Sequence, residues 1–313
     1  MSANAQGGWP QNRSSELAVV FLLLMGLAAM YMLLRPDRVV QAQPQADQLR
    51  MAVRLNDMEA IKRQVAAGFD IDLPASQGTT LLAEAVAAGH IQMASLLLQS
   101  GSRVDAINPA TGETPLFIAV RANRPDFIRL LMTNGADPDR MNLANRTPLM
   151  VAVESRAMLA LEQLLLSGAA ITRRTPQGEN ALMQAARQGA LPEADRLINA
   201  DAPLEERNLN RETALTIAVK NGQAAVAKLL LDSGAVIHNE MDIAVQIYNK
   251  TIIRMLLERN STISDATSQT LMRRVKQEGD LEFMAFLASY GLERGPNVGL
   301  QPLPGSAARV STH

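Results

Sequence analysis

The chain repeats itself with a period of 33 or 34 residues, and this period limits what it can fold into. Equivalent positions recur at spacings of 33, 34, 33, 33 and 33 residues, at Asp47, Thr80, Thr114, Thr147, Asn180 and Thr213. A period of this length is typical of a solenoid, in which no unit buries its apolar face alone and each packs against its neighbours. The sequence therefore predicts a stack of similar units.

Each unit has the pattern of a helical hairpin. Thr114 suits a helix N-cap, and Pro115 suits the first helical position, where its missing N–H costs nothing. Five positions after each cap stands a small residue that lets neighbouring helices approach closely: Ala85, Ala119, Ala152, Ala185 and Ala218. Glycines suited to end the second helix in a left-handed conformation follow at Gly68, Gly101, Gly135, Gly168 and Gly234. With only 3% aromatic residues, we expect an all-helical body with an aliphatic core.

These motifs resemble the ankyrin repeat over residues 47–292. The matching segments are Thr114-Pro115-Leu116, Thr147-Pro148-Leu149, Gly89-His90 and Leu96-Leu97-Leu98 before Gly101. The family's histidine after the Leu is replaced by Ala83, Phe117, Met150, Met183 and Thr216. The resemblance implies an all-α ankyrin-repeat solenoid of about eight helix-turn-helix units.

The last two units depart from the pattern. The seventh begins near Asn239, only 26 residues after Thr213, which predicts a shortened connecting loop, or finger. In its closing position Asn260 replaces Gly and tolerates the same backbone. The eighth carries Arg273, Arg274, Lys276 and Glu278, as expected of a solvated terminal unit.

A long apolar segment precedes the repeats. Residues 17–34 are eighteen residues without a charge, and as a helix they would span about 27 Å, close to the thickness of a bilayer core. We expect a tail over 1–16, a single transmembrane helix over 17–34, a linker over 35–46, the repeat domain over 47–292 and a disordered tail over 293–313. The alternative for the apolar segment is a cleaved signal peptide, because Val40-Gln41-Ala42 resembles a cleavage site.

Flanking charges bear on which side of the membrane the repeats face. Arg13 precedes the segment, whereas Arg35, Arg38 and Arg50 follow it. Basic residues stay cytoplasmic, so the bias favours a cytoplasmic repeat domain. An exported domain facing the cell envelope is the alternative, and the absence of cysteine is compatible with either. High Ala, Leu and Met content gives the composition a bacterial character.

The sequence offers little for catalysis. A net charge of -1 argues against nucleic acid binding. The three histidines, at 90, 238 and 313, have no metal-ligand spacing, and His90 occupies an ordinary turn position of the repeat. Carboxylate pairs such as Asp137 with Asp139 or Glu205 with Glu206 fall on exposed fingers, where no pocket would shift a pKa. We therefore expect no enzyme activity, no metal, no cofactor and no small-molecule substrate.

What remains is surface for a protein partner, and the resemblance implies binding by the finger tips and first helices along a concave groove. One residue before each cap and seven after it, the charges are opposite: Glu113 with Arg121, Arg146 with Glu154, Glu179 with Arg187, and Glu212 with Lys220. Two interpretations stay open. The charges could form a salt-bridge ladder running from unit to unit, or they could form a docking surface that recognises a partner by its charge pattern. Asp139, Arg173 and Glu205 at the finger tips are further candidates. The expected function is a non-enzymatic, membrane-anchored adaptor that localises or stabilises a partner; the alternative is a structural or protective component of an envelope or secretion assembly.

Overall fold

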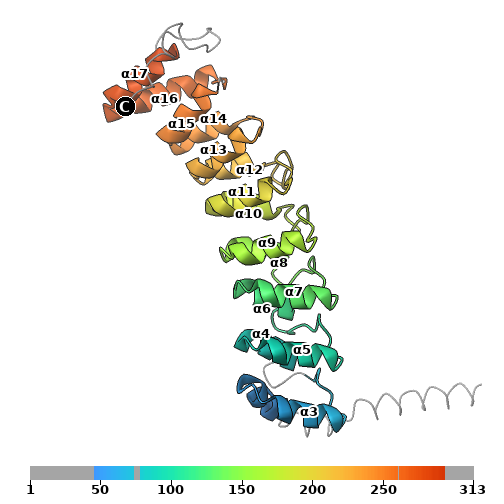
Figure 1. Ribbon diagram of the computed structural model, residues 1–313. Coiled ribbons are helices and arrows are strands. Elements are labelled where there is room, and N and C mark those ends of the chain that lie inside the picture. Colours follow the sequence, from blue (N-terminus) through green and yellow to red (C-terminus); the bar gives the residue numbers. More distant parts are fainter. Residues whose placement is uncertain (1–45, 74–77, 260, 293–313) are drawn as a thin grey trace, which may run out of the picture.

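The computed structural model describes residues 46–73, 78–259 and 261–292. These residues form an elongated, curved stack of helices that runs in chain order from one end to the other (Figure 1). Within these ranges the chain forms helices and no strands, as the sequence predicts. The predicted tail 1–16, transmembrane helix 17–34, most of the linker 35–46, Asn260 and the tail 293–313 lie outside the described residues.

Eight helix pairs make up the described part of the chain. The first pair is a helix over residues 46–54 followed by α3 (Met58–Ala66). The next five pairs are α4 (Leu81–Ala88) with α5 (Ile91–Gln99), α6 (Pro115–Arg121) with α7 (Pro125–Thr133), α8 (Pro148–Glu154) with α9 (Met158–Leu166), α10 (Ala181–Gln188) with α11 (Leu191–Ile198), and α12 (Ala214–Lys220) with α13 (Ala224–Asp232). The last two are α14 (Glu240–Ile247) with α15 (Lys250–Glu258) and α16 (Asp265–Glu278) with α17 (Leu281–Ser289).

Most of the predicted caps hold the first helices as expected. The side-chain oxygen of Thr147 accepts a hydrogen bond from the Met150 N–H at 3.2 Å, and Thr80, Asn180 and Thr213 do the same in their units. Thr114 is the exception, because its buried hydroxyl oxygen makes no such bond. Pro115 there supplies the first helical residue with a φ already suited to the helix.

The core runs without interruption through the stack. Consecutive first helices contact each other from α4 to α16, and so do the second helices from α5 to α15. The five recurring alanines, Ala85, Ala119, Ala152, Ala185 and Ala218, are all fully buried between first helices, which confirms their predicted role. Six of the seven residues of α8 are buried, against three of the nine in α9. From α4 to α12 the first helices are therefore mostly core, and their C-terminal ends reach the surface.

The glycines predicted to end the second helices are left-handed, with φ between 78° and 97° at Gly68, Gly101, Gly135, Gly168 and Gly234. The fifth unit has Asp201 in this position, at φ 61°. Asp tolerates the left-handed region better than most residues, so this unit closes without glycine.

None of the helices in the described ranges combines the length and the apolar character needed to cross a membrane. Because the apolar segment 17–34 lies outside these ranges, its predicted membrane role stays a prediction.

Candidate protein-binding face

Four loops, which we call the fingers, join the second helix of one unit to the first helix of the next over residues 102–113, 136–146, 169–179 and 202–212. Each finger closes on itself through a backbone bond near its tip. The donors and acceptors are Asn108 N to Glu113 O, Asn142 N to Arg146 O, Thr175 N to Glu179 O and Asn208 N to Glu212 O, at 2.8 to 3.0 Å. The closed turn places a charged residue directly before each cap.

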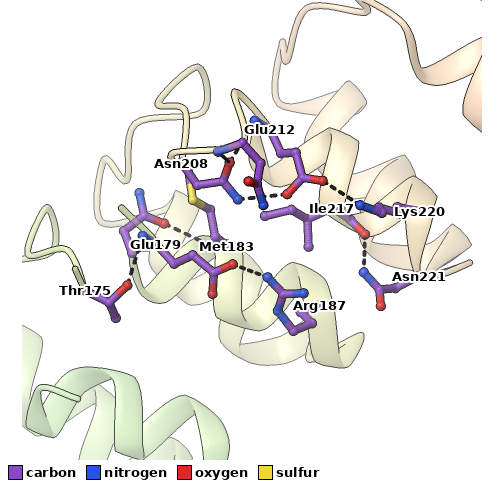
Figure 2. A network of polar contacts seen from close by, with 11 residues as sticks. Thr175, Glu179, Met183, Arg187, Asn208, Glu212, Ile217, Lys220 and Asn221 are labelled. Atoms are coloured by element: carbon purple, nitrogen blue, oxygen red, sulfur yellow. Dashed lines mark hydrogen bonds and ion pairs between the residues drawn. The ribbon is translucent and has the colours of Figure 1, made fainter. Parts of the chain in front are cut away.

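Each of these charged residues pairs with the end of the first helix that it precedes. Arg146 lies 2.9 Å from Glu154, and Lys220 lies 2.8 Å from Glu212. Glu113 pairs with Arg121 and Glu179 with Arg187 in the same way. Figure 2 shows two of these pairs side by side, with each glutamate reaching from the base of a finger to the end of a first helix. All eight predicted groove residues are thus brought together in four pairs.

The pairing corrects one interpretation of the sequence, the salt-bridge ladder running between units. Each of the four ion pairs joins a finger to the first helix that directly follows it, because the finger folds back over that helix. With each finger counted as part of the unit whose first helix it precedes, every pair lies within its own unit. Ion pairs between neighbouring units do occur elsewhere in the stack, as between Arg254 and Glu282 at 2.9 Å, but these four pairs are not of that kind. The Glu113 carboxylate also accepts a hydrogen bond from the next unit, at 3.3 Å from the Asn142 side chain.

The pairs do not present their two charges equally to solvent. The Glu212 side chain is 14% exposed and that of Lys220 is 60% exposed, and the Glu113 and Glu179 pairs show the same imbalance. Only the reversed pair, Arg146 with Glu154, is evenly exposed. The surface formed by the fingers and the ends of the first helices, which we call the finger face, therefore offers cations more openly than carboxylates.

Glu212 has the most extensive set of partners among the four glutamates. Burial alone would raise the pKa of its carboxyl, but hydrogen bonds from Lys220 and Asn208 outweigh that effect and lower the pKa below its ordinary value. Asn208 in turn accepts from the Glu212 and Asn210 N–H groups. The carboxylate is thus held in one place by a finger that is itself fixed.

A second set of carboxylates links the units, and sequence reasoning missed it. Four residues after the position that ends a second helix, a side chain accepts a hydrogen bond from a backbone N–H of the next unit. This carboxylate series comprises Asp72 with Arg103 N, Asp105 with Asp137 N, Asp139 with Ala170 N, and Glu205 with Val236 N, at 2.8 to 3.0 Å. The signal was present in the sequence, because the acidic residues share the 33-residue period.

The carboxylate series is interrupted once, and both partners change there. The acceptor position holds Thr172, and the donor position in the next unit holds Pro203, which has no N–H. Other contacts connect these two units: Leu209 N donates to Gln177 O at 3.0 Å, and Asn180 donates to Glu206 at 2.9 Å.

The three predicted finger-tip residues, Asp139, Arg173 and Glu205, already make hydrogen bonds or ion pairs within the stack. Asp139 is 19% exposed and holds both the Ala170 N–H and, at 3.8 Å, the Arg173 side chain. Glu205 is more open, but it accepts from Val236 N and lies 3.2 Å from His238. Asp105 shows how closed these positions are, since burial raises the pKa of its carboxyl.

The two histidines in the described ranges, His90 and His238, make local contacts in the stack. His90 Nε2 lies 3.0 Å from the Arg54 carbonyl oxygen in the preceding unit. Across residues 46–73, 78–259 and 261–292, no three His, Asp or Glu side chains come close enough together to hold a metal ion.

Comparison with known proteins identifies the repeat. A family model described as ankyrin repeats in three copies matches residues 49–142 and 149–242. The ankyrin repeat protein FPV240 of fowlpox virus is 35% identical over 94 residues, which are 30% of this chain and 23% of the viral protein. Protein phosphatase 1 regulatory subunit 27 of Mus musculus is 34% identical over 91 residues, 29% of this chain and 58% of that protein. The match thus spans less than two thirds of either relative.

The fold also matches a solved structure. The crystal structure of the ankyrin repeat domain of Bcl-3 aligns with a TM-score of 0.57 and 25% identity, covering 60% of this chain and 86% of that one. Since the family model covers more than half of the sequence, the chain belongs to the ankyrin repeat family.

Proposed function

We propose that the chain is a non-enzymatic adaptor, tethered to a membrane by residues 17–34, that holds a protein partner on its finger face. Ankyrin repeats bind protein partners in general, and the finger face of this stack carries ordered, accessible charge at four successive units. The observation that carries the proposal is the row of four ion pairs at equivalent places on successive units. A row of this kind fits an extended macromolecular surface better than a small molecule, because its charges are spread over four units.

Two properties of the pairs favour recognition over simple attraction. Each pair is nearly neutral, so the electrostatic attraction between the finger face and distant charged molecules is weak. The exposed cations are held by carboxylates that are mostly covered, so their ordering is largely complete before a partner arrives. A partner with matching charges would meet a surface that needs little rearrangement.

The test is affinity capture from detergent-solubilised membranes with the full chain and with its Arg121→Glu/Arg187→Glu variant. We expect the variant to lose the partner while it keeps its helical spectrum. The matched control is Arg129→Glu, because Arg129 is exposed on α7, a second helix. Equal capture by all three chains would refute binding on this face.

The side of the membrane is tested separately. The bias of Arg35 and Arg38 supports a cytoplasmic repeat domain, and the exported arrangement is the alternative. A topology reporter fused after residue 313 distinguishes them, and N-terminal sequencing that found a mature chain starting near Gln43 would replace the anchor with a signal peptide. The bacterial source suggested by composition is likewise a proposal.

A further inference from the structure

The finger face changes where the sixth unit meets the seventh. The segment between α13 and α14 is residues 233–239, much shorter than residues 199–213 between α11 and α12. The connection is thus shortened, as the spacing of 26 residues predicts. Beside it lies a hollow of about 680 Å³ between the fourth finger, 202–212, and helix α14.

The lining of this hollow combines cations with aliphatic side chains. Arg207 and Arg211 come from the fourth finger and Lys220 from the end of α12, while Ile243 and Ile247 come from α14. Ile247 is 40% exposed, which is unusual for an isoleucine on a first helix of this stack. The one carboxylate in the lining, Glu212, is already bound to Lys220.

The ion pair of the earlier units is missing here. In the seventh unit, the position before the cap holds His238 and the position seven after it holds Gln246, where the third to sixth units have a carboxylate and a cation. Arg207 contacts only the His238 ring, at 3.1 Å through its side chain, and Glu205 nearby is engaged with Val236 N and the same ring. Within the described ranges no hydrogen bond or ion pair is formed by the Arg211 side chain. Two arginines therefore face the hollow without a carboxylate of their own.

Arg211 is also held in an unfavourable backbone conformation. Its φ is 62°, in the left-handed region, and the equivalent positions of the other three fingers are Gly112, Asn145 and Gly178. Gly and Asn enter this region easily, whereas a long side chain such as Arg does so at a cost. A strained residue that points a free charge at a hollow is the kind of outlier associated with binding sites.

We propose that this hollow is the anchoring subsite for an acidic segment of the partner, in which a carboxylate side chain neighbours an aliphatic one. The inference rests on the proposed function. The carboxylate would bind Arg207 and Arg211, whose guanidinium groups match its two oxygens, and the aliphatic side chain would cover Ile243 and Ile247. The isoleucines beside the arginines favour a peptide carboxylate over a bare phosphate, which would leave that apolar surface uncovered.

The experiment selects peptides from a random displayed library on the full chain in detergent micelles, after removal of those that bind its Arg207→Glu/Arg211→Glu variant. We expect the retained peptides to share Asp or Glu beside Leu, Ile or Val. Replacing that acid by its amide should weaken binding at least tenfold, and Ile243→Ser/Ile247→Ser should also weaken it. Arg129→Glu should change nothing.

A second variant separates binding from folding. Arg211→Gly relieves the left-handed strain, so its Tm should not fall while peptide binding drops at least fivefold; Arg211→Lys should retain most of the affinity. The proposal is overturned if no peptide depends on the two arginines, if those that do lack acidic residues, or if inorganic phosphate competes fully and the isoleucine variants bind normally, which would mean a simple anion site.

Partner capture distinguishes this inference from the proposed function. Capture abolished by Arg121→Glu/Arg187→Glu but unchanged by Arg207→Glu/Arg211→Glu would leave the finger face standing and reject the hollow as its anchor. Capture unchanged by either variant would reject the proposed function itself.

Discussion

A left-handed glycine can be required by its own backbone or by what lies against it, and this chain contains both cases. An added Cβ at Gly135 would meet nothing within 4 Å, whereas at Gly112 it would lie 2.8 Å from the Leu143 backbone nitrogen. The reason is that the finger containing Leu143 packs closely over the one before it and donates its N–H to Thr111 O at 2.9 Å.

We therefore expect Gly112→Ala to destabilise the chain more than Gly135→Ala. Both substitutions place a Cβ at positive φ, which costs about 1–2 kcal/mol, and Gly112→Ala adds about 1–3 kcal/mol of steric conflict with backbone. Chemical unfolding of the two variants measures the difference. Equal losses would show that the neighbouring finger moves aside freely.

Glu212 should contribute stability that depends on pH. Its pKa is lowered in the folded chain, so the folded state releases its proton more readily than the unfolded state does. The contribution is then complete above the ordinary value of 4.5 and is lost as pH falls through the lowered pKa. At pH 7 we expect Glu212→Gln to lose about 1 kcal/mol. Thermal unfolding from pH 7 to pH 3 should show the two chains converging, and a constant gap would contradict the assignment.

At the scale of the element, the pairing of finger with helix can be tested by exchanging charges. Arg121→Glu should cost up to about 1 kcal/mol, and adding Glu113→Arg should restore most of the loss, since the pair is local. The same cycle between Arg121 and Glu154 should give a coupling near zero, because those residues belong to different units. A larger coupling across units than within one would revive the ladder.

The interruption of the carboxylate series offers a gain of stability. Thr172→Asp alone should gain nothing, because Pro203 offers no N–H to accept from. Combined with Pro203→Ala, it should complete the link and stabilise the chain by about 1 kcal/mol. A melting-temperature series of the two single variants and the double variant checks this, and strict additivity would contradict it.

The sequence predicted features that depend on one unit alone better than features that depend on two. The capping role of Thr80 and the closing role of Gly101 follow from local backbone preferences, and both were confirmed. The link from Asp139 to Ala170 N was missed because it requires knowing which faces of neighbouring units meet. Thr114 fails as a cap although its sequence context is the most typical, which shows that a motif fixes the helix start without fixing every bond.

The same limit applies to the candidate binding residues. Opposite charges eight positions apart predicted pairs, but whether they joined one unit or two depended on how far the finger folds back. The unusual position of Arg211 could have been recognised from the sequence, since Arg stands where the other three fingers have Gly or Asn. The hollow beside it could not be predicted, because its shape depends on how the shortened connection between α13 and α14 packs against the fourth finger.

At the scale of the whole molecule, we expect deletion of residues 1–40 to leave a folded, helical monomer. The first described helix, residues 46–54, already contributes Leu49 and Val53 to the core, and Arg50 lies 2.9 Å from the buried Glu84 of the second unit. Circular dichroism and light scattering of the truncated chain measure helix content and mass. A truncated chain without a helical spectrum would mean that the segment before residue 41 contributes to the core.

Because each of the four ion pairs is complete within its own unit, each of these four units contributes no net charge through its pair to the finger face. Duplication or loss of one unit in evolution would move the neighbours apart or together without leaving a lone carboxylate or a lone cation at the new junction. The length of the binding surface can thus change by whole units while its charge balance stays the same, which lets one design of unit suit partners of different size.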